Sequence, residues 1–430
     1  MKATGNLKRA ISVLLIAVLA LGALALSGCN TKSEASKKIV IWAYDYYIDA
    51  AKEAVKQYEG IDPGVEFEIV ELGQDDLVEK FRIALASGNK DILPDIVCEE
   101  DYNLKGYLEF YEDNFVDLTS YVDPALYVDF KVKNVTYNDK IWGVPYDTAV
   151  GAWFYRSDIF EDAGFSEEDL QNITWDRFVE IGQAIKEKTG KYIIPLVPEG
   201  NIEGRVMLQS AGSWYYDDDG ALDITNNKAI VDMTETIKTL MASGVIYEVT
   251  SWDDIIAAFY NGTTAGVIGG SWWAPIISEN DSQFGLWRVA PIPRMTGDSK
   301  YTNFSNTGGC SWLVLNKSNK QTAIDFLMDT LAVSDSIANV LVKEKMVVPA
   351  LISARSVENA QIGDPYFGNQ NLCELMAEWS AHVPYVNYSS HSYEIAYYHG
   401  SLFPDYLRGK TAVEDVIKAL QQQAEIIEAQ

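Results

Sequence analysis

The chain has 430 residues, a formal net charge of −28 and a hydrophobic content of 48 %. Such an excess of acids repels phosphate backbones and no cluster of Lys and Arg offsets it, so the composition excludes nucleic acid as a partner. The apolar content excludes a disordered polymer, and the length predicts two or three domain-sized units.

The first 29 residues have the pattern of a secretory signal. Lys2, Lys8 and Arg9 precede an uncharged apolar run, Ile11 to Ala25, which is too short to span a membrane as a helix. The sequence that follows, Leu26-Ser27-Gly28-Cys29, resembles the bacterial lipoprotein processing site.

This resemblance implies a signal peptide at residues 1–28 and a lipid on Cys29, which places the protein outside the cytoplasm on the outer face of the cell membrane. Residues 29–38 are polar and small and predict a flexible tether. An ordinary signal peptide in which Cys29 is incidental is the alternative interpretation.

Strand and helix patterns alternate after the tether. Ile39–Ala43 predicts a buried strand, Ile48–Tyr58 a helix and Val65–Ile69 a half-buried strand. A second helix is expected around Leu77–Leu85 and a third strand at Pro94–Val97. This order is typical of a mostly parallel sheet with helices on its faces, so the predicted fold class is α/β.

The same patterns return in the second half of the chain. We expect a helix over Trp175–Lys188 and strands at Ala265–Ile268 and Cys310–Leu315. Gly and Pro around Trp272-Trp273 predict a loop there. Near the end, Thr411 to Glu414 fits a capping box that begins an amphipathic helix.

Catalytic and metal-binding motifs are absent from the sequence. The three histidines have no zinc-site spacing, and neither a phosphate-binding loop nor a nucleophile elbow occurs. We therefore expect no metal and no cofactor. Three cysteines follow Cys29, namely Cys98, Cys310 and Cys373, and they are predicted to be buried thiols. One disulfide between two of them stays possible.

Aromatic residues are the main excess of the chain, with 11 Trp, 25 Tyr and 15 Phe. Several follow predicted strands, where ligands of open α/β sheets bind. A flat ring packs on the C–H face of a sugar, and nearby carboxylates and amides partner its hydroxyls. The aromatic groups considered are Tyr44 and Tyr46 beside Asp45, Trp214, Trp272 with Trp273, and Tyr388.

Seven short segments occur in a characteristic order: Pro94–Val97, Trp142–Tyr146, Phe154–Gly164, Thr174–Phe178, Phe259–Gly262 with Gly269–Trp272, Ala290–Pro293 and Gly308–Trp312. Together they resemble the extracellular solute-binding proteins of carbohydrate ABC importers, the superfamily of maltose-binding protein. The resemblance covers nearly all of the chain after Cys29.

The resemblance implies a two-lobed, type II periplasmic-binding-protein-like fold with hinged lobes around a ligand cleft. The N-terminal lobe is expected to comprise residues 39–146 and 294–348. The C-terminal lobe is expected to comprise residues 147–293 and 349–430.

The resemblance also implies the binding residues. Trp272 holds the position of the aromatic that packs on a sugar ring, and acids just after the third strand bind sugar hydroxyls. The full set of expected ligand-binding residues is Tyr44, Asp45, Tyr46, Glu99, Glu100, Asp101, Asp147, Trp214, Trp272, Trp273, Trp312 and Tyr388.

The function implied is that of a monomeric, lipid-anchored receptor that binds an oligosaccharide and delivers it to the transmembrane subunits of an ABC permease, without chemistry. The anchor and tether favour a Gram-positive source. Two alternatives stay open. The same fold could bind a polyamine or a peptide, or the chain could be a secreted glycosidase whose two carboxylates are hidden among its 62 acids.

Overall fold

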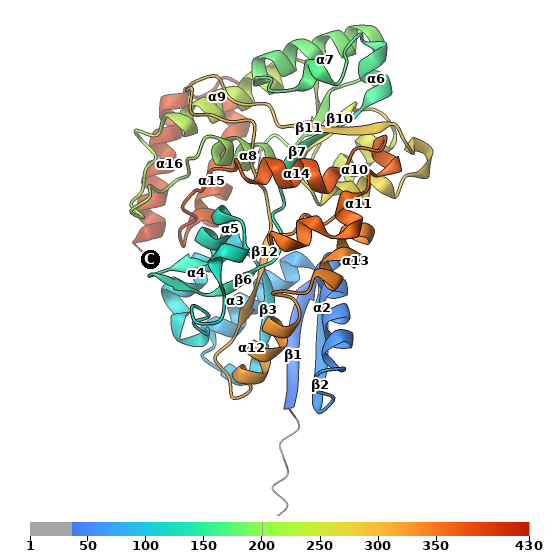
Figure 1. Cartoon of the computed structure of the whole chain (residues 1–430). Helices are drawn as coiled ribbons and strands as arrows, with labels where there is room; N and C mark the ends of the chain where they lie inside the picture. Colours follow the sequence, from blue (N-terminus) through green and yellow to red (C-terminus); the bar gives the residue numbers. More distant parts are fainter. Residues whose placement is uncertain (1–36, 200, 430) are drawn as a thin grey trace, which may run out of the picture.

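The computed structural model, which describes residues 37–199 and 201–429, has two α/β lobes (Figure 1). The first lobe contains a five-stranded sheet in the order β2-β1-β3-β12-β6. In this sheet β1 is parallel to both of its neighbours, β2 and β3, whereas β12 is antiparallel to both of its neighbours, β3 and β6. Its strands are β1 (Lys37–Tyr44), β2 (Val65–Leu72), β3 (Ile96–Glu100), β6 (Gly143–Pro145) and β12 (Cys310–Val314).

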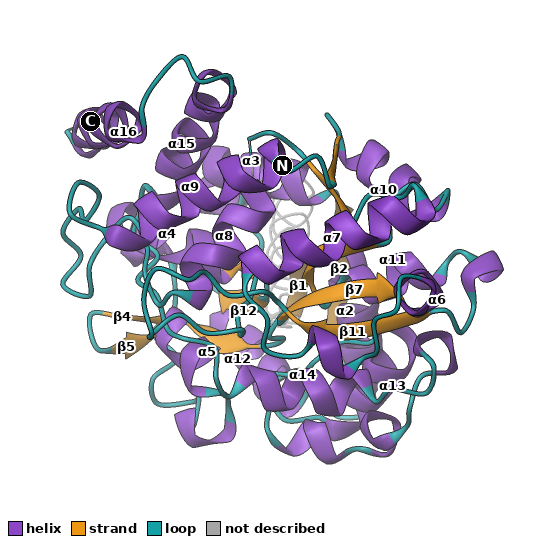
Figure 2. Ribbon diagram, turned by 90° about the horizontal axis from the view of Figure 1, so that it is seen from above, coloured by secondary structure: helices purple, strands orange, loops and turns teal. Residues whose placement is uncertain are grey.

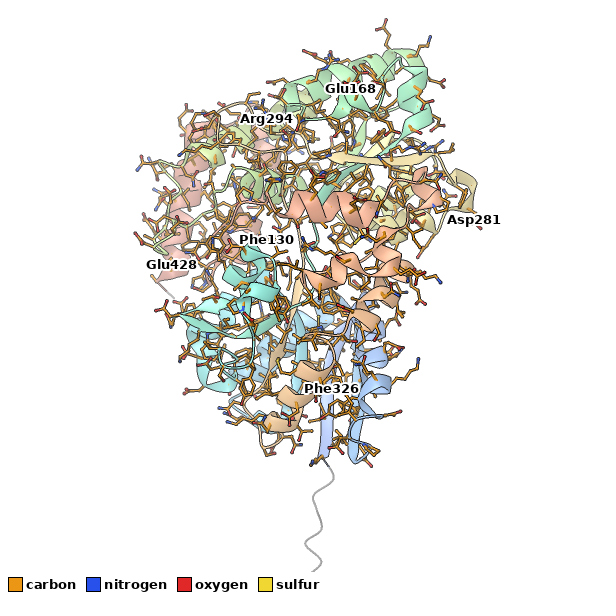
Figure 3. The ribbon with its side chains drawn as sticks, in the orientation of Figure 1. Phe130, Glu168, Asp281, Arg294, Phe326 and Glu428 are labelled. Carbon is orange, nitrogen blue, oxygen red and sulfur yellow. The ribbon has the colours of Figure 1, made fainter. Side chains whose placement is uncertain are left out.

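Helices cover this sheet because each parallel connection needs a crossover. They are α2 (Asp45–Tyr58), α3 (Gln74–Ala86), α4 (Asp101–Tyr111), α5 (Asp129–Asn134), α12 (Lys320–Asp329) and α13 (Asp335–Lys345). A short hairpin, β4 (Thr136–Tyr137) and β5 (Lys140–Ile141), lies beside them. Their apolar faces bury a core that includes Ile41, Trp312 and Phe326, the last labelled in Figure 3.

The second lobe contains an antiparallel sheet, β10-β7-β11, and a parallel pair, β8-β9. A parallel bridge between Tyr192 and Thr264 joins the two, so that β8 runs in the direction of β10. The strands are β7 (Gly151–Arg156), β8 (Ile194–Leu196), β9 (Ile246–Glu248), β10 (Gly266–Gly270) and β11 (Trp287–Pro291).

The helices of the second lobe surround these strands, as the view from above shows (Figure 2). They are α6 (Ser157–Asp162), α7 (Trp175–Thr189), α8 (Asn201–Ser210), α9 (Lys228–Ala242), α10 (Trp252–Tyr260), α11 (Trp273–Ser278), α14 (Leu372–Ser380), α15 (Ser392–Leu407) and α16 (Val413–Glu428). In the part of the chain that the structure describes, no helix is long and apolar enough to cross a bilayer.

Three chain segments run side by side between the lobes. Asp147 bridges to Pro349, and Val150 bridges to Asn306. Met295 packs in the core of the second lobe, whereas Ala350 and Leu351 pack in that of the first. We propose that the lobe boundaries expected at 293 and 348 lie later in the chain, near Gly309 and Ala354.

The predicted α/β fold class with two lobes is confirmed, while three local predictions differ from the structure. Lys37 and Lys38 belong to β1 rather than to the tether, because they pair with Val65 and Glu66 of β2. The signal peptide and Cys29 lie outside the described residues.

The predicted capping box at Thr411 is wrong. The residue with extended backbone that precedes α16 is Ala412, and no side chain caps the helix. The amphipathic helix itself is confirmed, with Val416, Leu420 and Ala424 buried. Trp273 is not in a loop either, since it begins α11.

Candidate functional site

The carboxyl ends of the parallel strands of both lobes face the junction between the lobes. β1, β2 and β3 end at Tyr44, Leu72 and Glu100. In the second lobe, Gly270 at the end of β10 pairs with Gly151, immediately after the chain has crossed from the first lobe. Because open α/β sheets bind ligands beyond the carboxyl ends of their strands, this junction is the candidate site.

Asp147 organises the residues that follow β1. Its carboxylate accepts hydrogen bonds from Tyr46 Oη at 2.9 Å, Tyr47 Oη at 3.0 Å and the backbone N–H of Cys310 at 2.8 Å. The Tyr44 hydroxyl lies 2.8 Å from Cys310 Sγ. The fully buried Asp147 therefore ties α2 to the crossing segment, and its oxygens are already occupied by the protein.

Asp45 is the most exposed of the predicted residues after β1. It begins α2 with a positive φ of 45°, a conformation that non-glycine residues adopt rarely. Burial of part of its carboxyl raises the pKa of Asp45. The side chain is consequently available to a ligand, whereas Tyr44 is buried.

Glu99 and Asp101 are buried within the first lobe. Glu99 accepts hydrogen bonds from Asn103 Nδ2 at 2.9 Å and the backbone N–H of Glu100, and burial raises the pKa of Glu99 to about 7. Asp101 pairs with the buried Lys131 ammonium at 2.6 Å and accepts a hydrogen bond from Ser311 Oγ at 2.6 Å. Both carboxylates thus have partners in their own lobe.

Glu100 reaches the other lobe. Its carboxylate forms an ion pair with Arg205 of α8 and accepts a hydrogen bond from Gln74 Nε2 at 3.3 Å. The Arg205 guanidinium also lies 4.3 Å from the centre of the Tyr102 ring. Arg205, Gln74 and Tyr102 were not among the expected binding residues. For Arg205 the reason is that no local pattern shows which distant residue meets Glu100.

Trp214 and Tyr388 form an aromatic cluster with Tyr102 rather than an open platform. Tyr102 lies edge-on to Trp214 at 5.9 Å and to Tyr388 at 5.2 Å, and all three are buried. Trp214 Nε1 donates to Ser392 Oγ, and Tyr388 Oη donates to Gln209 Oε1. Tyr102 comes from the first lobe but packs in the core of the second, so this cluster joins the lobes.

The three predicted tryptophans differ in access. Trp312 is buried in the first core and Trp273 in the second lobe, where Trp273 Nε1 donates to the carbonyl of Ile268. Trp272 keeps part of its ring exposed, lies over Gly270 and donates from Nε1 to the carbonyl of Thr307 at 2.8 Å. Of the three, Trp272 is the one that a ligand can contact in this structure.

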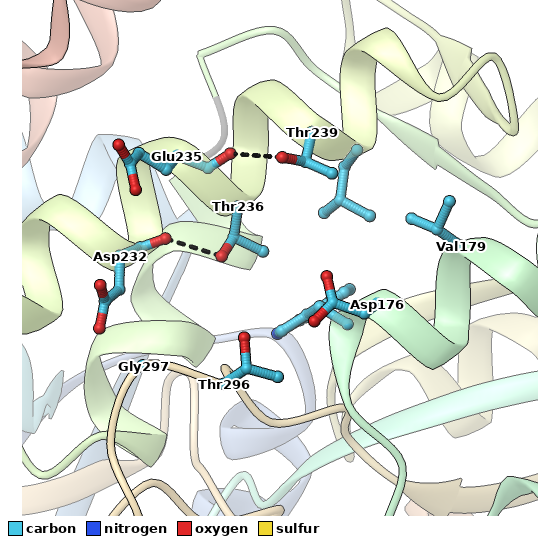
Figure 4. A pocket seen from close by; sticks show the side chains of 10 residues that line it. Asp176, Val179, Asp232, Glu235, Thr236, Thr239, Thr296 and Gly297 are labelled. Carbon is cyan, nitrogen blue, oxygen red and sulfur yellow. Dashed lines mark hydrogen bonds between the residues drawn. The ribbon is translucent and has the colours of Figure 1, made fainter.

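A separate pocket of about 180 Å³ lies between α7 and α9, and none of the predicted site residues lines it (Figure 4). Asp176 and Asp232 contribute acids to its wall. The hydroxyls of Thr236 and Thr239 donate to backbone carbonyls of α9, so towards a ligand they can act only as acceptors. The junction of the lobes therefore remains the better candidate.

Comparison with known proteins agrees with this geometry. Residues 53–360 match the family described as bacterial extracellular solute-binding protein. The chain is 36 % identical over 421 residues to a lactose-binding protein of Rhizobium radiobacter, covering 97 % of each chain.

Two solved structures share the fold. An ABC transporter associated binding protein from B. animalis subsp. lactis, in complex with β-1,6-galactobiose, aligns with a TM-score of 0.72 and 21 % identity over 90 % of this chain and 96 % of its own. The sugar-binding protein MalE from Xanthomonas citri aligns with a TM-score of 0.74 and 19 % identity over 91 % of this chain and 97 % of its own. The chain belongs to the bacterial extracellular solute-binding protein family.

Proposed function

We propose that this protein is the substrate-binding receptor of an ABC sugar importer, which captures an oligosaccharide between its lobes and delivers it to the membrane permease. The observation that carries the proposal is the identity of 36 % to a lactose-binding protein over almost the whole chain. It is supported by Trp272, an accessible aromatic ring at the carboxyl end of β10.

The proposed site has the mixture of groups that a sugar needs. The Trp272 ring offers an apolar face to the C–H surface of a pyranose. Asp45, Gln74 and the Glu100–Arg205 pair offer acceptors and donors to its hydroxyls, each of which needs a partner once water is removed.

We propose that the protein binds and releases its ligand without chemistry. Glu99, Glu100 and Asp101 are engaged by Asn103, Arg205 and Lys131 respectively. These engagements leave little free carboxylate for a polyamine, which would need several uncompensated acids. A glycosidase would need two carboxyl groups, one on each side of the glycosidic bond, and these three carboxyl groups already have partners within the protein.

We also propose that Cys29 carries a lipid that anchors the protein to the outer face of the membrane. The apolar run and the Leu26–Cys29 segment support this proposal. The description of the family as extracellular agrees with a location outside the cytoplasm.

The test of the proposed function is the melting temperature of the domain from Lys37 onward. The panel contains lactose, β-1,6-galactobiose, malto-, xylo- and manno-oligosaccharides, spermidine and a peptide mixture. A ligand at 100 times its Kd adds about 2.7 kcal/mol, which raises the melting temperature by a few degrees.

We expect one sugar class to raise the melting temperature and Trp272→Ala to abolish the rise. A rise with spermidine or peptide, and none with any sugar, would refute the carbohydrate assignment. Release of reducing ends during incubation would instead show a glycosidase.

A further inference from the structure

Trp252, at the start of α10, is a large exposed apolar residue beside the candidate sugar platform. Its side chain is 43 % exposed. Its ring lies parallel to the buried Trp273 at 4.5 Å and 8°, and 5.6 Å from Trp272 at 43°. Trp273 thus covers one face of the Trp252 indole, so the exposed area of Trp252 lies on the rest of its side chain.

The topology brings Trp252 and Trp272 to one edge of the second lobe. β8, β9 and β10 run in the same direction, so their carboxyl ends share an edge. Trp252 follows the end of β9 at Glu248, and Trp272 follows the end of β10 at Gly270. Both rings therefore stand where a ligand of this sheet would lie.

Both rings are held in place before any ligand arrives. Trp272 is fixed by its bond to the Thr307 carbonyl. Trp252 is fixed by its stack on Trp273 and by the helix start, where Ser251 Oγ accepts from the backbone N–H of Asp254 at 3.1 Å. A rigid aromatic surface costs little conformational entropy when a ligand binds, so its contact area is converted efficiently into affinity.

We infer that Trp252 and Trp272 form a two-ring platform that holds consecutive sugar rings of an oligosaccharide, with Trp252 binding a ring beyond the one on Trp272. The inference rests on the proposed function and adds a ligand residue and a length preference to it. The tilt of 43° between the indoles suits two sugar rings that are turned relative to each other across a glycosidic bond.

The test is calorimetric titration of wild type, Trp252→Ala, Trp252→Tyr and Trp272→Ala with two series of increasing length. The series are lactose, galactosyl-lactose and digalactosyl-lactose, and maltose, maltotriose and maltotetraose. Phe284→Ala, which removes a ring that is 61 % exposed elsewhere on the same lobe, is the matched control.

In the series that wild type binds, we expect Trp252→Ala to leave the disaccharide Kd within about twofold and to weaken the trisaccharide about tenfold, equivalent to about 1.4 kcal/mol. Trp252→Tyr should retain most of the affinity, Trp272→Ala should weaken every length, and Phe284→Ala should weaken none. Unchanged melting temperatures of the free variants would show that they fold.

Two results would overturn the inference while the proposed function stands. In one, Trp252→Ala binds every length like wild type. In the other, it weakens the disaccharide as much as the trisaccharide, which would mean that Trp252 only supports its neighbours. If wild type binds no sugar in either series or in the melting panel, the proposed function fails and this inference fails with it.

Discussion

Glu99 shows how burial can raise the pKa of a carboxyl group near the candidate site. The side chain is fully enclosed, and desolvation raises its pKa from 4.5 to about 7 despite the bonds from Asn103 and the Glu100 backbone. Glu203 in α8 is raised to about 7 for the same reason. Both carboxyl groups therefore take up protons in the folded state at a pH where they are ionised in the unfolded chain.

This acidity predicts a stability that falls as the pH rises. Between about pH 4.5 and 7 the folded state binds more protons than the unfolded state, so the stabilisation from Glu99 is present below pH 4.5 and is lost as the pH rises through 7. The loss for one such group is roughly 3 kcal/mol. We expect Glu99→Gln to reduce the fall between pH 5 and 8, measured by urea unfolding.

The matched control for this prediction is Glu59→Gln, an exposed acid after α2 that should leave the pH dependence as in wild type. An identical fall in Glu99→Gln and wild type would contradict the prediction. It would mean that folding does not raise the pKa of Glu99.

At the scale of elements, α4 of the first lobe packs directly on residues 385–394 of the second. Lys105 Nζ donates to Tyr385 Oη at 2.7 Å and to Asn387 Oδ1 at 2.6 Å, and burial lowers the pKa of Lys105 to about 8. A Cβ on Gly106 would lie 2.8 Å from the carbonyl oxygen of Ser390. The absence of a side chain at Gly106 is what lets the two elements approach.

Gly106→Ala should therefore hold the lobes apart. We expect the sugar Kd to be weaker by several-fold, measured by calorimetric titration. Gly204→Ala in α8 is the control, because its nearest neighbours lie 3.5 to 3.9 Å away and alanine favours the helix by about 0.5–1 kcal/mol. Equal behaviour of the two variants would show that the contact with Ser390 does not limit closure.

At the scale of the whole molecule, the acidic receptor is proposed to work while tethered to a membrane. Seven residues separate Cys29 from Lys37, so a lipid on Cys29 would lie within roughly 25 Å of the start of β1. Cys29→Ser should move the protein from the membrane fraction to the soluble fraction of cells that express the full chain. Cys373→Ser, which changes a buried free thiol, should stay with the membrane.

Retention of Cys29→Ser on the membrane would contradict the anchor, and so would an N-terminal peptide without lipid in the mass spectrum of the wild-type protein. Either result would leave the sugar-binding proposal intact. The two proposals depend on separate parts of the chain.

Much of the fold was predictable because its signals are local. The alternation in Val65–Ile69 and the helical spacing in Trp175–Lys188 correspond to β2 and α7, and their order along the chain is that of an α/β lobe. The ordered segments from Pro94–Val97 to Gly308–Trp312 indicated the family. The predicted capping box at Thr411 was wrong because Thr411 has the right residue type but lies one position before Ala412, the residue that precedes α16.

The candidate site was predictable as a region and not as a set of contacts. Sequence alone placed acids and aromatics after strands, and the structure brings Glu100, Trp272 and Asp45 to the junction of the lobes. It also buries Trp273, Trp312 and Asp147. The partner of Asp147 shows why this was not predictable, because Cys310 lies far from it in the sequence.

The sequence by itself therefore determined the fold class, the family and the strand ends that carry the candidate residues, since each follows from periodicity or from short ordered motifs. Only the tertiary structure decided which of those side chains stay accessible, that Arg205 meets Glu100, and that Trp252 stands beside Trp272. The burial and pairing of a side chain depend on contacts with residues distant in sequence, and a local pattern does not show which distant residue will contact it.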